Sequence, residues 1–193
     1  MSKQNRKTRD FPPLQERVIL SLARNNAQTI NETMKQINGQ YKSTWIAFDT
    51  LKKKGLIKSV TTKEYHGTKY PSFWLTELGI FLAISRGADP QTILIRAREF
   101  YPKDINLQFL IETTPILGEN AFEVLYLAAL TKGKIEQTDI DSILANQMRT
   151  GFTPQVVKQF ITIAKKYPKQ YRQIVDSVNQ TQEKLSKISQ LLK

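Results

Sequence analysis

Residues 44–57 read TWIAFDTLKKKGLI and combine a helical pattern with a stop signal. Four of these residues recur at the spacing of one helix face, which predicts that they face a core: Thr44, Ala47, Phe48 and Leu51. Gly55 is suited to the left-handed conformation that ends a helix. The residues after it, 56–61, favour β-structure. The stretch therefore predicts a helix that leads directly into a strand.

The residues before this stretch predict two shorter helices. Apolar residues at helical spacing predict the first helix over residues 14–23. The second helix begins with a capping box at residues 29–32, in which Thr29 accepts a backbone N–H and Glu32 reaches back. It ends at Asn38-Gly39, a turn of the kind that requires a positive φ. Three helices are therefore expected before the strand.

The residues after the stretch predict a hairpin and a fourth helix. Residues 56–61 and 72–75 favour β-structure and are expected to pair with each other. The connection over residues 62–71 contains glycine, proline, two lysines and two tyrosines, which is typical of an exposed loop, or wing. Thr76 is expected to cap a fourth helix over residues 77–86.

This order of elements resembles the winged helix-turn-helix transcription regulators of the MarR and PadR kind. Three stretches carry the resemblance: TINE at residues 29–32, the stretch 44–57, and YPSFWLTELG at residues 70–79. PadR-like proteins usually have tyrosine where this chain has Trp45, so an aromatic residue is kept. The resemblance covers the N-terminal half only. It implies that the third helix enters the major groove, that the wing tip contacts the backbone or minor groove, and that a two-fold dimer sets the half-site spacing.

The charge of the chain indicates an anionic partner. The 193 residues include 29 Lys and Arg and 17 Asp and Glu, which gives a formal net charge of +12. Residues 1–87 hold 15 basic and 6 acidic residues, or +9, whereas residues 88–193 hold 14 and 11, or +3. A basic surface attracts the phosphate backbone of nucleic acid whatever its sequence. The first half is therefore expected to face double-stranded DNA.

Candidate DNA contacts fall in three segments, because the early residues of a recognition helix reach bases and the flanking cations reach phosphates. The third helix contributes Lys42, Ser43, Thr44, Trp45, Ile46, Thr50 and Lys53. The wing contributes Lys63, His66 and Lys69, and a basic arm over residues 1–10, expected to be disordered without DNA, contributes Arg6, Lys7 and Arg9. Two of these residues have a structural alternative, since Thr44 belongs to the inward stripe and Trp45 can fill the gap between helix and wing.

The second half of the sequence predicts only helices. Proline and glycine separate expected helices at residues 91–101, 104–114, 119–132, 138–149 and 154–167. From Pro168 onward, apolar residues alternate at spacings of three and four, which is the pattern of a heptad seam. The seam residues expected to mediate dimerisation are Tyr171, Ile174, Val178, Leu185, Ile188 and Leu192.

The predicted fold is therefore mainly α-helical with a small β-hairpin wing. A winged helix-turn-helix domain is expected over residues 11–87, after the arm. An all-helical domain is expected over residues 88–167, and a long, coiled-coil-like dimerisation helix over residues 168–193.

Composition excludes several kinds of chemistry. The absence of cysteine and the presence of a single histidine exclude disulfides, thiolate chemistry and multi-histidine metal sites. The chain also has no glycine-rich phosphate loop and no apolar run of membrane-spanning length. We therefore expect a cytoplasmic, non-enzymatic transcriptional regulator without cofactor, metal or membrane contact. Its expected partners are double-stranded DNA and a second copy of itself, and a small-molecule effector is possible although no residues mark its site.

Two other functions are compatible with the sequence. The winged helix could contact protein as part of a scaffold, a reading that Trp45 and the unassigned helical half favour. The basic half could also bind nucleic acid without sequence preference, as architectural proteins do. Fold alone does not decide between these functions.

Overall fold

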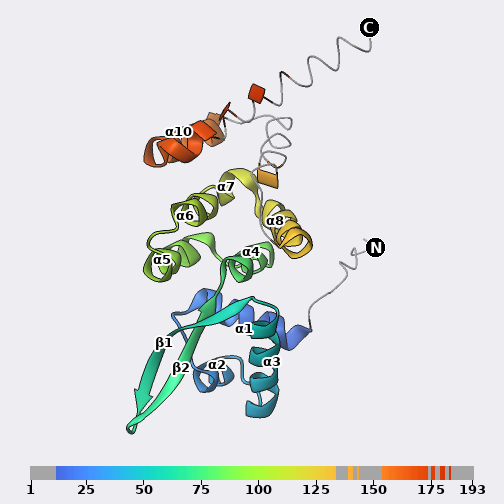
Figure 1. The fold of residues 1–193 in the computed structure, drawn as a ribbon, viewed down its shortest axis with the longest axis vertical. Coiled ribbons are helices and arrows are strands. Elements are labelled where there is room, and N and C mark those ends of the chain that lie inside the picture. Colours follow the sequence, from blue (N-terminus) through green and yellow to red (C-terminus); the bar gives the residue numbers. More distant parts are fainter. Residues whose placement is uncertain are drawn as a thin grey trace. The chain divides into compact units, whose positions relative to one another are not determined.

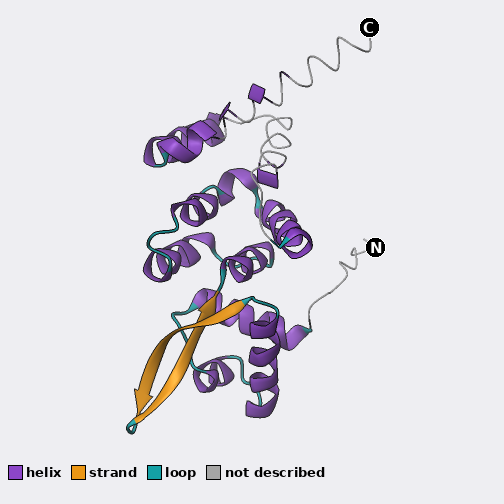
Figure 2. Cartoon of the chain, viewed as in Figure 1, coloured by secondary structure: helices purple, strands orange, loops and turns teal. Residues whose placement is uncertain are grey.

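The computed structural model describes residues 12–133, 139, 140, 143, 154–173, 175, 176, 179, 180 and 183. These residues are mainly α-helical, with one β-hairpin (Figure 1, Figure 2). The chain divides into two units between Ile93 and Leu94. The predicted arm contacts and most of the heptad seam lie outside the described residues: Arg6, Lys7, Arg9, Ile174, Val178, Leu185, Ile188 and Leu192.

The first unit begins with the three predicted helices, α1 (Pro13–Arg24), α2 (Ile30–Gln36) and α3 (Tyr41–Lys53). The capping box of α2 is present in both directions. The backbone N–H of Glu32 donates to Thr29 Oγ1 at 3.3 Å, and the backbone N–H of Thr29 donates to the Glu32 carboxylate at 2.7 Å. Asn38 adopts the positive φ, 48°, in the short connection to α3. The inward stripe of α3 is buried as predicted, and Gly55 has the expected left-handed φ of 69°.

The hairpin consists of antiparallel strands β1 (Ile57–Tyr65) and β2 (Thr68–Leu75). The prediction of a loop over residues 62–71 is wrong, because only His66 and Gly67 form the turn. Their φ values are 49° and 76°. Positive φ at both turn residues is the mark of a type I′ turn, whose twist matches that of the two strands. The wing is therefore a two-stranded ribbon with a tight tip.

The base of the hairpin is anchored to the helices. Gln28, which lies between α1 and α2, pairs with Phe73 through backbone hydrogen bonds of 3.0 and 2.8 Å. Trp74 is completely buried, and its indole N–H donates to the carbonyl of Leu22 at 2.9 Å. Phe48 of α3 meets Phe73 edge to face, with ring centroids 5.3 Å apart. These contacts connect β2 to both α1 and α3.

Helix α4 (Glu77–Ser85) is capped by Thr76 as predicted. The Thr76 hydroxyl accepts from the backbone N–H of Gly79 at 3.2 Å and donates to the carbonyl of Gly55 at 2.6 Å. Every residue from 79 to 84 is buried. A helix that is apolar on all sides must be covered on all sides, and α1 and β2 are among the elements that contact it.

The described part of the second unit is helical. It comprises most of α5 (Pro90–Phe100), then α6 (Ile105–Glu112), α7 (Thr114–Leu117), α8 (Glu119–Lys132) and α10 (Pro154–Lys166). The expected helix at 138–149 lies largely outside the described residues. Residues 115–118 were expected to separate two helices, but residues 114–117 form the short helix α7, whose first turn accommodates Pro115. The division between the units falls inside α5, whereas the predicted domain boundary followed residue 87.

A single carboxylate connects three elements of the second unit. Glu112, at the end of α6, accepts from Lys166 Nζ at 2.6 Å, from the Tyr167 hydroxyl at 2.7 Å and from Arg98 at 3.3 Å. Burial raises the pKa of Glu112, but the hydrogen bonds from Lys166 and Tyr167 and the nearby charges outweigh it and lower the pKa. The rings of Phe109 and Tyr167 add an edge-to-face contact with centroids 5.5 Å apart.

Residues 168–173 are helical and carry the one seam residue of the predicted dimer whose side chain is described, Tyr171. Its ring packs edge to face on Phe160 of α10, with centroids 5.3 Å apart. The Tyr171 ring therefore packs, at least in part, against its own chain. The long terminal helix and the dimer stay predictions, since the remaining seam positions are not described.

Candidate nucleic-acid interface

The exposed face of α3 combines lysines with large apolar side chains. Trp45 and Ile46 are each 50% exposed, and Tyr41 is 53% exposed. Lys42 and Lys53 are exposed at the two ends of the helix, and Ser43 and Thr50 are partly exposed. The structure therefore brings six of the seven predicted residues of this helix to positions that solvent reaches.

Thr44 is the exception, and its assignment as a DNA contact is corrected. It is completely buried, and its hydroxyl donates to the carbonyl of Gln40 at 2.9 Å. The reason is the helical period, since Thr44 shares the inward face with Ala47, Phe48 and Leu51.

Tyr41 is an exposed residue that sequence reasoning missed. It is the first residue of α3 and lies one helical turn before Trp45, so both side chains belong to the same face. The spacing of four between the two aromatic residues was the signal that could have found it.

The acidic residue on this face is neutralised locally. Asp49 forms an ion pair with Lys53 at 2.7 Å, one turn further along α3. The Thr50 hydroxyl donates to the carbonyl of Ile46 at 2.9 Å, so its donor is engaged within the helix. The pair of Asp49 and Lys53 is therefore neutral while it is formed, and Lys53, 75% exposed, can exchange Asp49 for a phosphate, while Lys42 at the other end of the face is exposed.

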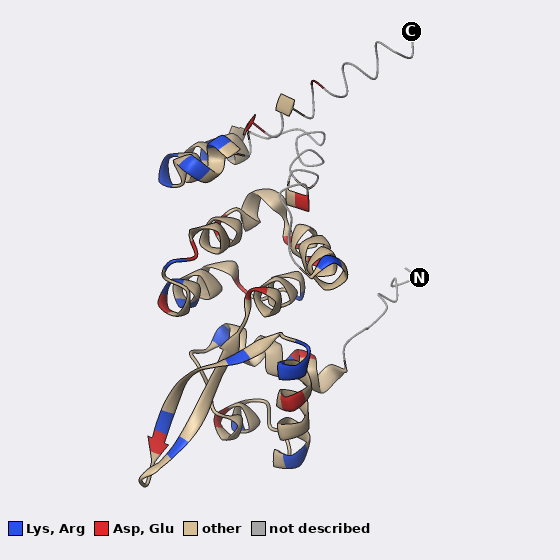
Figure 3. Ribbon diagram, in the orientation of Figure 1, with Lys and Arg blue, Asp and Glu red and all other residues tan. Residues whose placement is uncertain are grey.

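Lysines continue from α3 onto the hairpin. Figure 3 shows basic residues at both ends of α3 and along both strands of the ribbon. Lys58, Lys69 and the turn residue His66 are exposed. The rings of Tyr65 and Tyr70 lie 6.1 Å apart across the strands near the tip, which supports the ribbon in this part.

The ribbon is fastened to α2 through Glu32. The Glu32 carboxylate accepts from Lys63 Nζ at 2.8 and 2.9 Å and from the Tyr65 hydroxyl at 2.8 Å. Burial raises the pKa of Glu32, but hydrogen bonds from Lys63, from the Thr29 backbone and from Tyr65 outweigh it and lower the pKa to about 2. The carboxylate is therefore charged at neutral pH and holds β1 against the start of α2.

This arrangement gives Lys63 a structural role. Lys63 contacts both oxygens of a carboxylate that is only 31% exposed, so a phosphate contact would break a partly buried group, whereas the exposed pair of Asp49 and Lys53 costs little to break. We therefore remove Lys63 from the candidate DNA contacts of the wing. Strand geometry places Lys63 and Tyr65 on one face of β1, but nothing in the sequence pattern identified Glu32, 31 positions away, as the partner of Lys63.

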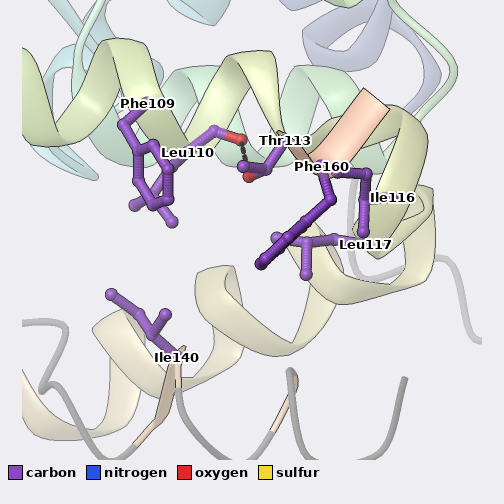
Figure 4. A pocket seen from close by; sticks show the side chains of 7 residues that line it. All are labelled: Phe109, Leu110, Thr113, Ile116, Leu117, Ile140 and Phe160. Carbon is purple, nitrogen blue, oxygen red and sulfur yellow. Dashed lines mark hydrogen bonds between the residues drawn. The ribbon is translucent and has the colours of Figure 1, made fainter. Parts of the chain in front are cut away.

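The first unit has an open pocket with a volume of about 260 Å³, lined by Arg17, Leu20, Ser21, Arg24, Asn25, Gln36 and Ile37. The described residues contain no cluster of three or more His, Asp or Glu side chains placed to bind a metal ion. An apolar pocket in the second unit has a cavity volume of about 10 Å³, close to the space of one water molecule (Figure 4). Seven side chains line it: Phe109, Leu110, Thr113, Ile116, Leu117, Ile140 and Phe160. As it stands, this pocket is too small for an effector.

The helices of the described residues are all too short or too polar to cross a bilayer. A comparison with models of known protein families and a search of curated proteins found no match to this chain.

Proposed function

We propose that this protein is a sequence-specific regulator of transcription that binds double-stranded DNA as a homodimer, through a winged helix-turn-helix in its first unit. The observation that carries the proposal is the surface formed by α3 and the hairpin. It presents hydrogen-bonding, cationic and apolar groups on one helix, and lysines on the ribbon that follows in the chain.

The arrangement of elements supports this proposal. Three helices precede the hairpin in the described first unit, and backbone pairing between Gln28 and Phe73 joins the α1–α2 connection to β2. The buried stripe of α3 fixes which face of that helix is exposed. A helix held in this way can enter a major groove as a rigid body while an adjacent ribbon follows the phosphate backbone.

Each candidate residue has a role in this proposal. Lys42 binds a phosphate at one side of the groove, and Lys53 binds one at the other after leaving its exposed pair with Asp49. Ser43, Trp45, Ile46 and Thr50 face the base edges. Lys69 and His66 at the ribbon tip contact the backbone or the minor groove. The arm residues Arg6, Lys7 and Arg9 add sequence-independent attraction, and the C-terminal seam joins two copies so that two half-sites are read.

The salt dependence of binding tests the phosphate contacts. Each phosphate contact contributes roughly 0.9 to the slope of log K against log salt concentration. The double variant Lys42→Ala, Lys69→Ala is therefore expected to bind duplex DNA more weakly and with a slope lower by about 1–2. An unchanged slope would show that these lysines do not meet phosphates.

A matched control separates local contacts from net charge. Lys103 and Lys158 are exposed lysines of the second unit. Their double alanine variant removes the same charge, and it is expected to leave the slope nearly unchanged. An equal decrease of the salt slope in both double variants would indicate a general electrostatic effect rather than a defined interface.

A protein partner is the second candidate function. The observation that favours it is the exposure of Tyr41, Trp45 and Ile46, since exposed apolar groups also mark protein interfaces. This function predicts that binding of duplex DNA at physiological salt is weak and indifferent to sequence. The lysines at both ends of the same face favour DNA instead.

A further inference from the structure

The exposed face of α3 holds more apolar surface than phosphate binding requires. Tyr41, Trp45 and Ile46 lie within six residues, and each has at least half of its surface exposed. Lysine, arginine, hydroxyl and amide groups bind phosphate, whereas an isoleucine side chain offers it nothing. These residues are also absent from the core of the first unit, which uses the opposite face of α3.

The major groove of DNA offers an apolar group of its own. The C5-methyl of thymine projects into the groove, and apolar side chains distinguish thymine through it. We propose that Ile46 and Trp45 bind thymine methyl groups, so that the preferred duplex has thymine opposite the N-terminal half of α3. This inference rests on the proposed function and names the bases that the site selects.

The charged residues around Trp45 and Ile46 favour DNA, rather than an apolar protein surface, as the binding partner. Lys42 lies one helical turn before Ile46, and Lys53 lies two turns after it, so cations flank the apolar groups along the helix. Lys53 pairs with Asp49 at 2.7 Å, and because this pair is exposed, Lys53 can exchange the carboxylate for a phosphate. Apolar groups between cations match a groove whose floor carries methyl groups and whose edges carry phosphates.

Replacing thymine by deoxyuridine tests the inference, because it removes only the methyl group and keeps the base pair. The probe is a duplex recovered from a random library by binding to the full chain. For the wild-type protein, deoxyuridine at the recognised thymine is expected to weaken binding about threefold to fivefold, the effect of losing one buried methyl group. The Ile46→Ala variant is expected to bind the two duplexes with a smaller difference, because it lacks the contact.

The control is Ile95→Ala, since Ile95 is an equally apolar residue of the second unit and is 61% exposed. This variant is expected to keep the full discrimination between thymine and deoxyuridine. Far-UV circular dichroism verifies that each variant is folded, because the tryptophan fluorescence includes Trp45, the neighbour of Ile46, as well as buried Trp74.

The outcomes separate this inference from the proposed function. An enriched duplex that binds equally well with deoxyuridine at every thymine would overturn the methyl contact and leave the regulator proposal standing. Equal discrimination by wild type and Ile46→Ala would overturn the assignment to Ile46. If the library yields no enriched duplex, the proposed function fails, and the methyl contact fails with it.

Discussion

At the scale of single residues, Gly79 fixes how α4 meets the start of the hairpin. A Cβ atom at this position would lie 2.0 Å from the carbonyl oxygen of Leu56. That oxygen already accepts the backbone N–H of Thr76 at 3.0 Å, so it is not free to move away. A glycine is needed here because of close backbone packing and not because of a turn.

The Gly79→Ala variant is therefore expected to be destabilised by roughly 3 kcal/mol, the upper range for overpacking in a core. The control is Gly55→Ala, where φ is +69° and no atom lies within 4 Å of the added Cβ. It is expected to cost only about 1–2 kcal/mol of backbone strain. Urea unfolding followed by tryptophan fluorescence measures the unfolding free energy of both variants. An equal decrease in the two variants would contradict the packing argument.

Glu32 makes the stability of the first unit depend on pH. Its pKa is about 2 in the folded chain, below the ordinary value of 4.5. A lowered pKa means that the charged form stabilises the fold above pH 4.5, and that this contribution is lost as the pH falls from 4.5 toward 2. We expect Glu32→Gln to lower the free energy of unfolding by about 1–2 kcal/mol at pH 7, after allowance for solvent screening.

The measurement is the difference in unfolding free energy between wild type and Glu32→Gln at several pH values. This difference is expected to shrink as the pH falls from 5 to 3. The control is Glu64→Gln, an exposed residue close to the ribbon tip, which is expected to have little effect at any pH. A difference that does not change with pH would show that the carboxylate charge is not what holds the ribbon.

At the scale of elements, Glu112 determines how α10 attaches to α6. Its hydrogen bonds to Lys166 and Tyr167 join residues more than fifty positions apart in the sequence. Glu112→Gln removes the charge that both groups bind, so we expect faster amide hydrogen exchange in residues 154–166. Glu123→Gln on α8 is the control. Unchanged exchange in α10 would indicate that apolar packing alone holds it.

The elements also show what the sequence could and could not predict. Periodicity identified α3 and its buried stripe, because one face of that helix meets the core at every turn. The hairpin was predicted, but its outer part, residues 62–65 and 68–71, was expected to be a loop, because this segment is polar and no hydrophobic alternation marks the strands there. The attachment of Lys63 to Glu32 depends on pairing between positions 31 apart, which local patterns do not specify.

At the scale of the whole molecule, reading two half-sites requires two copies of the chain. The heptad pattern after Pro168 predicts this dimer, and we expect a dimeric mass by analytical ultracentrifugation. The double variant Val178→Asp, Leu185→Asp places charges in the seam and is expected to shift the protein to monomers. Gln180→Asp with Gln182→Asp, off the seam, adds the same charge and is expected to leave the dimer intact. A monomeric mass for the wild-type protein would contradict dimerisation through the seam.

In the proposed function, the first unit reads a DNA sequence and two copies of the chain act together. Selection of bound duplexes from a random library at physiological salt, with the mass in solution measured on the same preparation, tests this claim most directly. We expect an enriched motif with two inverted half-sites about one helical turn apart, together with a dimeric mass. Weak binding without an enriched motif would contradict it and would favour a protein partner for the exposed face of α3.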